Sequence, residues 1–147
     1  VLENVQDPGN LGTMFRTGEG AGISGVIMDK CTVDIYNPKT IRSTMGSIFR
    51  VPFYITEDLH GTLGQLQEKG IRVYAAHLEG SVCYDEPDYK GGTAFLIGNE
   101  GNGVSRLVKE KCDFTTAIPM NGDIDSLNAS VAAGVLAFEI VRQRMAK

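Results

Sequence analysis

No stretch of the 147-residue sequence approaches the ~20 consecutive apolar residues that are needed to cross a bilayer. The first residues also lack the order of a secretory signal, in which basic residues precede an apolar run. Both absences favour a cytoplasmic protein. The length is that of one compact domain and 42% of the residues are hydrophobic, so we expect residues 1–147 to form a single domain with its own core.

Cysteine is scarce, with single residues at Cys31, Cys83 and Cys112. They are odd in number and widely spaced, and no two of them form a Cys-x-x-Cys pair. This pattern argues against a disulfide framework and against a zinc site. We expect three reduced, buried thiols and no bound metal.

Positive charge is also limited, since the net charge is −4 and the isoelectric point is about 5.1. An acidic balance argues weakly against a large nucleic-acid surface, because non-specific binding depends mostly on neutralising phosphates. One segment differs. The stretch PKTIRSTMGSIFR (Pro38 to Arg50) holds Lys39, Arg42 and Arg50 and no acid. It is either a local RNA-binding patch or a solvated basic face.

Short apolar runs rich in β-forming residues alternate with helical patterns along the chain. The runs are Val1 to Val5, Gly25 to Asp29, Pro52 to Ile55, Arg72 to Ala76, Ala94 to Ile97 and Phe114 to Ile118. The helical candidates are Leu11 to Gly20, Thr40 to Phe49, Leu59 to Lys69, Ser105 to Lys111 and Leu127 to Arg144. This alternation predicts an α/β fold with a mainly parallel sheet and helices on both faces. The chain starts within a predicted strand and without Met, so we expect that an upstream segment, and with it a second domain, is missing from this chain.

One glycine-rich stretch, Gly20 to Gly25, matches the dinucleotide fingerprint G-x-G-x-x-G. The fingerprint requires a strand before it and a helix that opens at its last glycine. Here a predicted helix precedes the glycines and a predicted strand follows them. We therefore interpret the stretch as a helix end and a turn, and a nicotinamide-dependent dehydrogenase is disfavoured.

A second glycine-rich stretch, Gly98-Asn99-Glu100-Gly101-Asn102-Gly103, follows a predicted strand and leads into a helix. Ligands of parallel sheets bind beyond the carboxyl ends of strands, so this is the right place for a ligand loop. It lacks the Lys-Ser/Thr ending of a phosphate-binding loop, and Glu100 would repel a phosphate. The alternatives are a cofactor loop and an ordinary turn with Glu100 in solvent.

Two further polar loops stand at strand ends. Asp7 to Gly12 follows the first predicted strand, and Arg16 lies six residues after Asn10 on the next helix. The third loop begins at Ile118, where Asp125 or Ser126 can cap the C-terminal helix. Along that helix small residues from Ser130 to Ala137 include Gly134, which is unfavourable in a helix unless something packs very closely against it.

Three stretches together resemble the ordered motifs of the SpoU, or TrmH, family of RNA ribose 2′-O-methyltransferases. They are DPGNLGTMFRTGEGAG (Asp7 to Gly22), FLIGNEGNGVS (Phe95 to Ser105) and IPMNGDIDSLNASVAAG (Ile118 to Gly134). The resemblance covers essentially the whole chain, and the basic stretch Arg-Ser-Thr-Met-Gly-Ser stands between the first two motifs, as in the family. It implies the SPOUT fold, in which a C-terminal deep trefoil knot binds S-adenosylmethionine, usually in a homodimer.

The resemblance also implies roles for individual residues. The catalytic set would be Asn10, Arg16, Glu100, Ser126 and Asn128. Cofactor contacts would come from Gly98, Asn99, Ile118, Met120, Ser126 and Leu127, with Ala76, His77 and Leu78 added by the loop after the fourth predicted strand. RNA contacts would come from Arg16, Lys39, Arg42 and Arg50, and no metal is required.

In the family an appended RNA-binding domain, commonly N-terminal, selects the RNA, and we expect that domain to be absent from this chain. The motifs look closer to the members that methylate 23S-type ribosomal RNA than to those that methylate tRNA. Two alternatives stay open: a tRNA ribose 2′-O-methyltransferase, and a knotted RNA-binding module that has lost catalysis.

Overall fold

The computed structural model describes residues 1–79 and 82–146. The elements follow one another as α1 (Pro8–Gly20), β1 (Val26–Asp29), α2 (Pro38–Ser43), the 3₁₀ helix η1 (Ser47–Phe49), β2 (Phe53–Thr56), α3 (Leu59–Glu68), β3 (Arg72–Ala76), β4 (Val82–Cys83), β5 (Thr93–Leu96), α4 (Arg106–Lys111), β6 (Phe114–Ala117) and α5 (Ala129–Met145). The predicted alternation of strands and helices is confirmed. None of the described helices is both long and apolar enough to span a membrane.

The strands form two parallel sheets, and Leu2 lies between them and pairs with both. One sheet is β1–β2, and the other has the order β4-β6-β3-β5. Leu2 makes one isolated parallel bridge to Met28 of β1 and another to Ile97, which directly follows β5. These two bridges join the sheets into one surface. The prediction of a strand from Val1 to Val5 is therefore wrong. Only Leu2 pairs, because the backbone turns at Asn4, whose φ is 52°.

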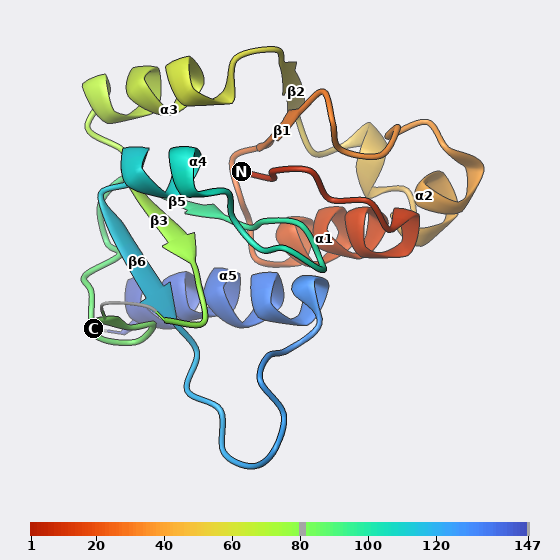
Figure 1. Ribbon diagram of the computed structural model, residues 1–147. Helices are drawn as coiled ribbons and strands as arrows, with labels where there is room; N and C mark the ends of the chain where they lie inside the picture. The colour runs from red at the N-terminus through yellow and green to blue at the C-terminus, as the bar shows by residue number, and fades with distance from the viewer. Residues whose placement is uncertain (80–81, 147) are drawn as a thin grey trace.

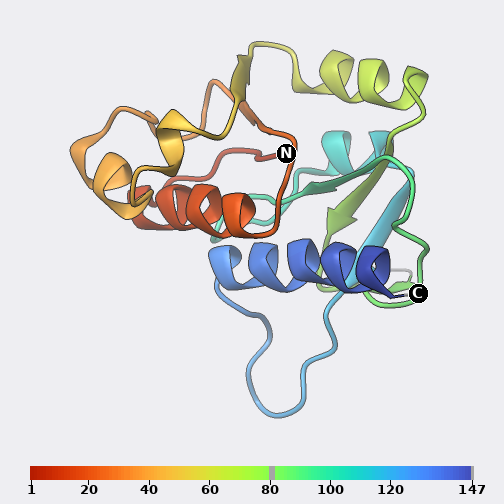
Figure 2. The same cartoon turned by 180° about the vertical axis from the view of Figure 1, so that it is seen from behind.

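Helices cover both faces of this surface, as predicted (Figures 1 and 2). On one face α3 and α4 pack over a core that includes Leu63, Val73 and Leu96. On the other face α1 and α5 lie side by side over a core that includes Phe15 and Leu136. The two cores account for the burial that the hydrophobic content led us to expect.

The glycines after α1 end the helix, which confirms that the G-x-G-x-x-G match is a turn. Ala21 is the C-cap and Gly22 adopts a φ of 70°, a conformation that glycine favours. The amide of Ile23 then donates to the carbonyl of Gly18 at 3.0 Å, the six-to-one bond of a Schellman motif. Strand β1 begins only after this turn.

The small residues of α5 allow it to approach α1 closely. A Cβ atom placed on Gly134 would lie 3.2 Å from Cγ2 of Thr17. This contact explains why a helix tolerates glycine there, and it confirms the close packing predicted for this part of α5. The knot predicted for the C-terminal segment stays a prediction.

Two other expectations need correction, and one short strand was not expected. The helix predicted over Thr40 to Phe49 is divided into α2 and η1, because Met45 and Gly46 both adopt positive φ. Strand β4 was not predicted, since it is only two residues long. The cysteines are free, but Cys31 is exposed and the other two are only partly buried.

Candidate active site

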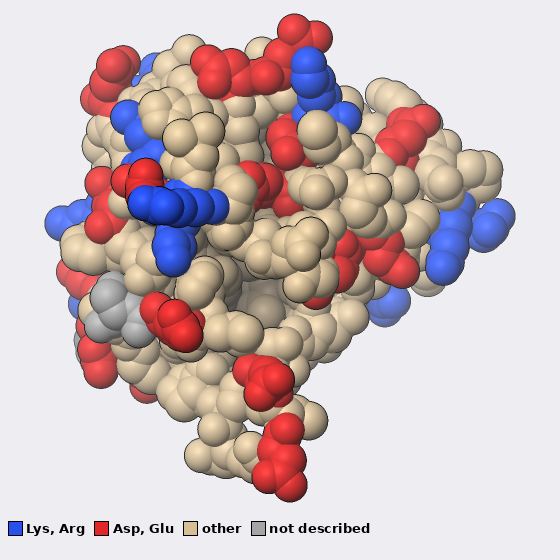
Figure 3. All heavy atoms as spheres, in the orientation of Figure 1, with Lys and Arg blue, Asp and Glu red and all other residues tan. Residues whose placement is uncertain are grey.

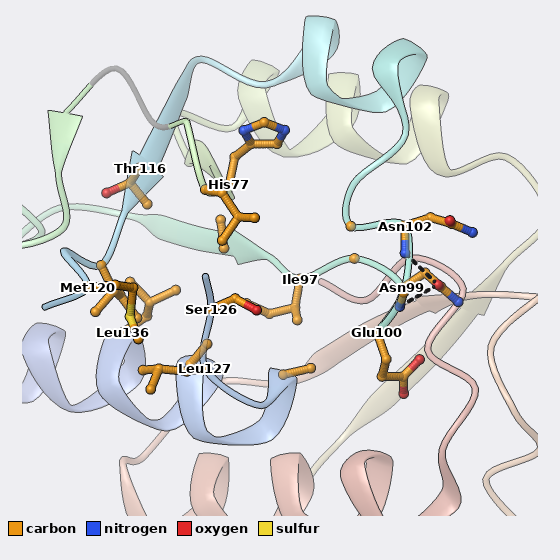
Figure 4. Close-up of a pocket in the computed structure, with 18 residues that line it drawn as sticks. His77, Ile97, Asn99, Glu100, Asn102, Thr116, Met120, Ser126, Leu127 and Leu136 are labelled. Atoms are coloured by element: carbon orange, nitrogen blue, oxygen red, sulfur yellow. Dashed lines mark hydrogen bonds between the residues drawn. The ribbon is translucent and has the colours of Figure 1, made fainter. Parts of the chain in front are cut away.

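A pocket of about 260 Å³ opens at the carboxyl ends of β3, β5 and β6, where parallel sheets bind their ligands. All nine residues predicted to contact a cofactor line it: Ala76, His77, Leu78, Gly98, Asn99, Ile118, Met120, Ser126 and Leu127. The hollow is visible on the face turned to the viewer in Figure 3, and Figure 4 shows its lining. Loops that are far apart in the sequence thus meet around one cavity.

A larger hollow of about 560 Å³ lies elsewhere, between the carboxyl end of α1, α5 and the sheet. None of the predicted site residues lines it. Its one charged side chain, Arg144, already donates to the carbonyls of Tyr89 and Gly91. Ligand sites combine apolar walls with converging polar groups. The smaller pocket has that character, because Asn99, Glu100 and Ser126 stand on its wall beside apolar side chains.

The loop after β5 is a tight, internally bonded turn. The backbones of Asn99 and Gly103 exchange two hydrogen bonds, of 3.1 and 2.8 Å, and Oδ1 of Asn99 accepts the amides of Gly101 and Asn102. A Cβ atom on Gly98 would lie 2.2 Å from the backbone carbon of Gly103, so only glycine fits there. The glycines therefore bring bare backbone to the edge of the pocket.

Glu100 is exposed, as the alternative of an ordinary turn expected, but its carboxylate does not lie free in solvent. Its oxygens accept hydrogen bonds from the backbone amides of Gln6, at 2.9 and 3.1 Å, and of Asp7, at 2.9 Å. Partial burial by itself would raise the pKa of Glu100, but the amides of Gln6 and Asp7 and the side chain of Asn10 together hold that pKa below its usual value. Glu100 thus joins the loop after β5 to the start of α1 as an anion.

Asn10 connects Glu100 to the third loop. Its Nδ2 donates to Glu100 at 3.3 Å, and its Oδ1 accepts a bond of 3.1 Å from Nδ2 of Asn128. Asn128 is also the N-cap of α5, where its Oδ1 accepts the amides of Ser130 and Val131. The prediction that Asp125 or Ser126 caps this helix is wrong, because α5 begins at Ala129, beyond the reach of either as the N-cap.

Three of the five predicted catalytic residues are therefore in direct contact, and two are not. Ser126 lies on the pocket wall two residues before Asn128. Arg16 is exposed on α1, about 9 Å along the helix axis from Asn10 at 1.5 Å per residue. Within residues 1–79 and 82–146, neither side chain forms a hydrogen bond or an ion pair. Both are free to contact a ligand.

The predicted RNA-binding cations divide into two kinds. Lys39 and Arg42 are exposed on α2, and Figure 3 shows basic side chains gathered over that helix at the right edge. Arg50 instead forms an ion pair with Glu19 of α1. The hydrogen bonding within this pair is the main reason why the pKa of Arg50 is raised and the pKa of Glu19 is lowered. Arg50 is thus the least available of the three for a phosphate.

His77 lines the pocket but has a local partner. Its Nδ1 accepts a hydrogen bond of 3.1 Å from the backbone amide of Glu79. In Figure 4 its ring points away from the cluster formed by Met120, Leu127 and Leu136. This arrangement favours a structural role for the imidazole over a catalytic one.

Several pocket residues were not predicted. They are Ile97, Gly101, Asn102, Gly103, Thr116, Ala129, Ala132 and Leu136. Gly101, Asn102 and Gly103 lie within the second motif, and Ala129 and Ala132 within the third, but none of them was assigned a cofactor contact. Leu136 had no such signal, because an apolar residue on a helix reads as core.

Comparisons with known proteins support the family resemblance. Residues 1–138 match the model of the SpoU rRNA Methylase family. The chain is 38% identical over 140 residues to the 23S rRNA (guanosine(2553)-2′-O)-methyltransferase RlmP of Bacillus subtilis, which covers 95% of this chain and 56% of that protein. The chain thus spans little more than half the length of this relative.

Two solved structures are similar to this one over almost its whole length. The SpoU methyltransferase AviRb from Streptomyces viridochromogenes, in complex with AdoMet, superposes with a TM-score of 0.92 at 31% identity, covering 99% of this chain and 57% of that one. The TrmH/SpoU tRNA modifying enzyme of A. aeolicus gives a TM-score of 0.87 at 30% identity, covering 97% of this chain and 73% of that one.

Proposed function

Since the chain belongs to the SpoU rRNA Methylase family, we propose that it transfers a methyl group from S-adenosylmethionine to a ribose 2′-hydroxyl of RNA. One observation carries the proposal: all nine residues that the family resemblance assigns to the cofactor line one pocket, and three of the catalytic set are hydrogen-bonded beside it. The whole protein's activity is a proposal because the chain spans only part of its relatives' length.

The lining of the pocket suits the chemistry of S-adenosylmethionine. Ile118, Met120 and Leu127 offer apolar contacts to an adenine ring. The loop that starts at Gly98 exposes backbone donors and acceptors for hydroxyl and amino groups. The relative AviRb was solved in complex with AdoMet, which supports the same cofactor here. When bound, this cofactor supplies an electrophilic methyl group on a sulfonium.

Arg16 is the residue of the set best suited to act on the RNA. A ribose hydroxyl is a weak nucleophile, and it becomes reactive as its proton leaves. Arginine has a pKa above ~12 and is a poor base at neutral pH. Its unpaired guanidinium can stabilise the developing alkoxide and hold an adjacent phosphate. We assign those two roles to Arg16, with the hydroxyl proton passing to a neighbouring phosphate or to water.

Asn10, Glu100 and Asn128 hold the three loops together rather than react. Their hydrogen bonds link the start of α1, the loop after β5 and the start of α5. Ser126 has a free hydroxyl on the pocket wall and is placed to contact the ribose or the cofactor. Alignment of reactants is a large part of such catalysis, so displacement of these loops should slow transfer. No metal is part of this mechanism.

Ribosomal RNA is the substrate class that we favour, because the relative RlmP acts on 23S rRNA. A tRNA remains the second candidate, since the A. aeolicus relative is a tRNA modifying enzyme. The part of the relatives that lies beyond this chain is where we expect an RNA-selecting domain. An inert RNA-binding module is disfavoured because Asn10, Arg16 and Glu100 are all present.

We also propose that the protein is a homodimer built on α5. Val131, Phe138 and Met145 recur every seven residues along this helix and are all substantially exposed. Residues at that spacing lie on one face of a helix. Exposed apolar residues gathered on one helix face are typical of protein interfaces. A second copy of the chain is the partner that the family resemblance implies.

The decisive experiment measures cofactor binding and methyl transfer separately. Calorimetry with S-adenosylmethionine tests the pocket, and transfer of a radiolabelled methyl group to ribosomal RNA or to tRNA tests the activity. We expect Arg16→Ala to lose about 10²–10³-fold in transfer while cofactor affinity stays at the wild-type value. Arg106→Ala, on the exposed side of α4, is the matched control and should retain activity.

Two results would contradict the proposal. Failure of the wild-type protein to bind S-adenosylmethionine would exclude the cofactor. Transfer at the wild-type rate by Arg16→Ala would remove Arg16 from the mechanism. Resistance of the product linkage to alkali locates the methyl group on the 2′-oxygen, because a blocked 2′-hydroxyl cannot attack the phosphate.

A further inference from the structure

The segment from Lys39 to Phe49 presents two large apolar side chains to solvent. Phe49 is 84% exposed and Met45 is 65% exposed. Their neighbours Ser47 and Ile48 are buried, so the segment has a packed side and a free side. No ring contact of Phe49 is present among the described residues. The fold itself therefore gives no reason for an aromatic ring at this position.

The backbone holds Met45 outward at an unfavourable conformation. Met45 has a φ of 50° and Gly46 a φ of 86°. A positive φ is uncommon for a bulky residue and usually has a structural or functional reason. Thr44 and Ser47, both fully buried, fix the turn through hydroxyl bonds of 2.7 Å to the carbonyls of Ile41 and Thr44. The turn is thus rigid on its buried side.

Free positive charge lies on α2, the helix that leads into the turn that carries these apolar groups. Lys39 and Arg42 are exposed and three residues apart on α2, so they lie on the same face of that helix. The amide of Met45 donates to the carbonyl of Arg42, which keeps the turn next to the cations. No acidic residue occurs between Pro38 and Arg50. Cations beside an unpartnered aromatic ring suit a ligand that has both phosphates and flat bases.

The same surface lies alongside Arg16. Gly12 of α1 packs against α2, since a Cβ atom there would lie 2.4 Å from Cβ of Ser43. Glu19, farther along α1, binds Arg50 just after η1. Residues four and seven apart share a helix face, so Gly12, Arg16 and Glu19 all face this segment. The packing at both ends therefore places the turn between α2 and η1 next to Arg16.

We propose that Phe49 and Met45 form a stacking surface for an unpaired base of the RNA, while Lys39 and Arg42 hold the phosphates that flank it. Single-stranded RNA is commonly held in this way, by aromatic side chains under splayed bases and by cations along the backbone. The stacked nucleotide would be a neighbour of the target, whose ribose then lies at Arg16. The inference rests on the proposed function, because it concerns the RNA of that reaction.

The test separates stacking from simple hydrophobicity. Phe49→Leu keeps an apolar side chain without a ring, and Phe49→Trp keeps a ring. The probe is a single-stranded RNA of about 12 nucleotides that carries the fluorescent base 2-aminopurine, a length within the range of known sites. Leu107→Ala, which removes a side chain 67% exposed on α4, is the control. Calorimetry with S-adenosylmethionine and sedimentation velocity accompany each variant.

We expect Phe49→Leu to weaken RNA binding about tenfold and to abolish the quenching of 2-aminopurine that stacking causes. The KM for RNA should rise, while cofactor binding and the rate at saturating RNA stay unchanged. Phe49→Trp should retain both binding and quenching, and Leu107→Ala should match the wild-type protein. A loss of folding would appear as a loss of cofactor binding in the same preparation.

Two outcomes would overturn the inference while the proposed function stands. One is a Phe49→Leu variant that binds and quenches the RNA probe as the wild-type protein does. The other is a change in sedimentation for that variant, which would assign Phe49 to a contact between two copies of the chain. If the wild-type protein neither binds RNA nor transfers a methyl group, the proposed function fails and this inference fails with it.

Discussion

Nδ2 of Asn128 donates a hydrogen bond of 3.1 Å to Oδ1 of Asn10, although 118 positions separate the two residues in the chain. Asn10 in turn donates to Glu100 at 3.3 Å. These two bonds join the three loops around the pocket into one connected unit. Asn128 is also the N-cap of α5. Separate variants are therefore needed to distinguish its effect on helix stability from the effect of its bond to Asn10.

Asn128→Asp separates the two effects. Aspartate is as good an N-cap as asparagine, so α5 should stay folded. However, an aspartate oxygen cannot donate to Asn10, and the new charge lies near Glu100. We expect thermal stability close to that of the wild-type protein but methyl transfer reduced by at least about tenfold, measured with S-adenosylmethionine and RNA at saturation.

Asn128→Ala is the companion variant, since it removes both the cap and the link to Asn10. It should lose about 1 kcal/mol of stability in denaturant titrations as well as activity. Equal activity of Asn128→Asp and the wild-type protein would show that the bond between Asn10 and Asn128 has no part in catalysis.

Glu100 predicts how stability changes with acid. Its pKa is lowered in the folded protein, so the unfolded chain binds a proton at a higher pH than the folded one does. The stabilisation by Glu100 is therefore complete above the ordinary value of 4.5 and is lost as the pH falls through the lower folded value. Glu100→Gln should remove this part of the pH dependence.

The measurement is the midpoint of thermal unfolding across a series of acidic buffers for both proteins. The difference between wild-type protein and Glu100→Gln should be largest near neutral pH and should shrink below pH 4.5. Glu57→Gln, at an exposed position after β2, is the control. A difference that stays constant or grows in acid would contradict the role given to the carboxylate.

Much of the pocket could be predicted from the sequence because its loops carry residues with distinctive backbone behaviour. Gly98 follows soon after the end of β5, and the motif that begins at Ile118 follows directly after the end of β6. Since strands of a parallel sheet end on one side, the loops had to meet there. Their convergence on one cavity followed from topology and the family resemblance together.

What could not be predicted depends on partners that leave no pattern in the sequence. The grip on Glu100 comes from the backbone amides of Gln6 and Asp7, and any residue but proline has such an amide. The N-cap of α5 could not be predicted because serine, aspartate and asparagine cap helices equally well. Asn128 is the cap because α5 begins at Ala129. The exposure of Phe49 is likewise a property of the turn at Met45 and Gly46, not of the phenylalanine itself.

Gly98 should be irreplaceable while its neighbour Gly101 is not. A Cβ atom on Gly98 would meet the backbone of Gly103 and Val104 at 2.2 to 2.4 Å, whereas one on Gly101 would meet only Oδ1 of Asn99 at 3.5 Å. Backbone cannot move aside as a side chain can. Gly98→Ala should therefore cost about 1–3 kcal/mol and weaken cofactor binding, while Gly101→Ala keeps both near wild type. Denaturant titration measures the stability of each variant, and calorimetry measures its affinity for S-adenosylmethionine. Equal values for the two variants would contradict the tight turn.

The exposed face of α5 gives the last prediction, which concerns assembly. Phe138 is 48% exposed, and its ring reaches towards the end of α1, where a Cβ atom on Gly20 would lie 3.9 Å from its Cζ. A carboxylate at this position cannot be buried without a partner, so Phe138→Glu should disfavour any dimer formed through this face. Leu107→Glu adds the same charge on α4, at a site that is also exposed and lies on the other face of the sheet. We expect sedimentation velocity to show a dimer for the wild-type protein and for Leu107→Glu, but a monomer for Phe138→Glu. Dimers in all three proteins would move the interface away from α5, and monomers in all three would exclude the dimer itself.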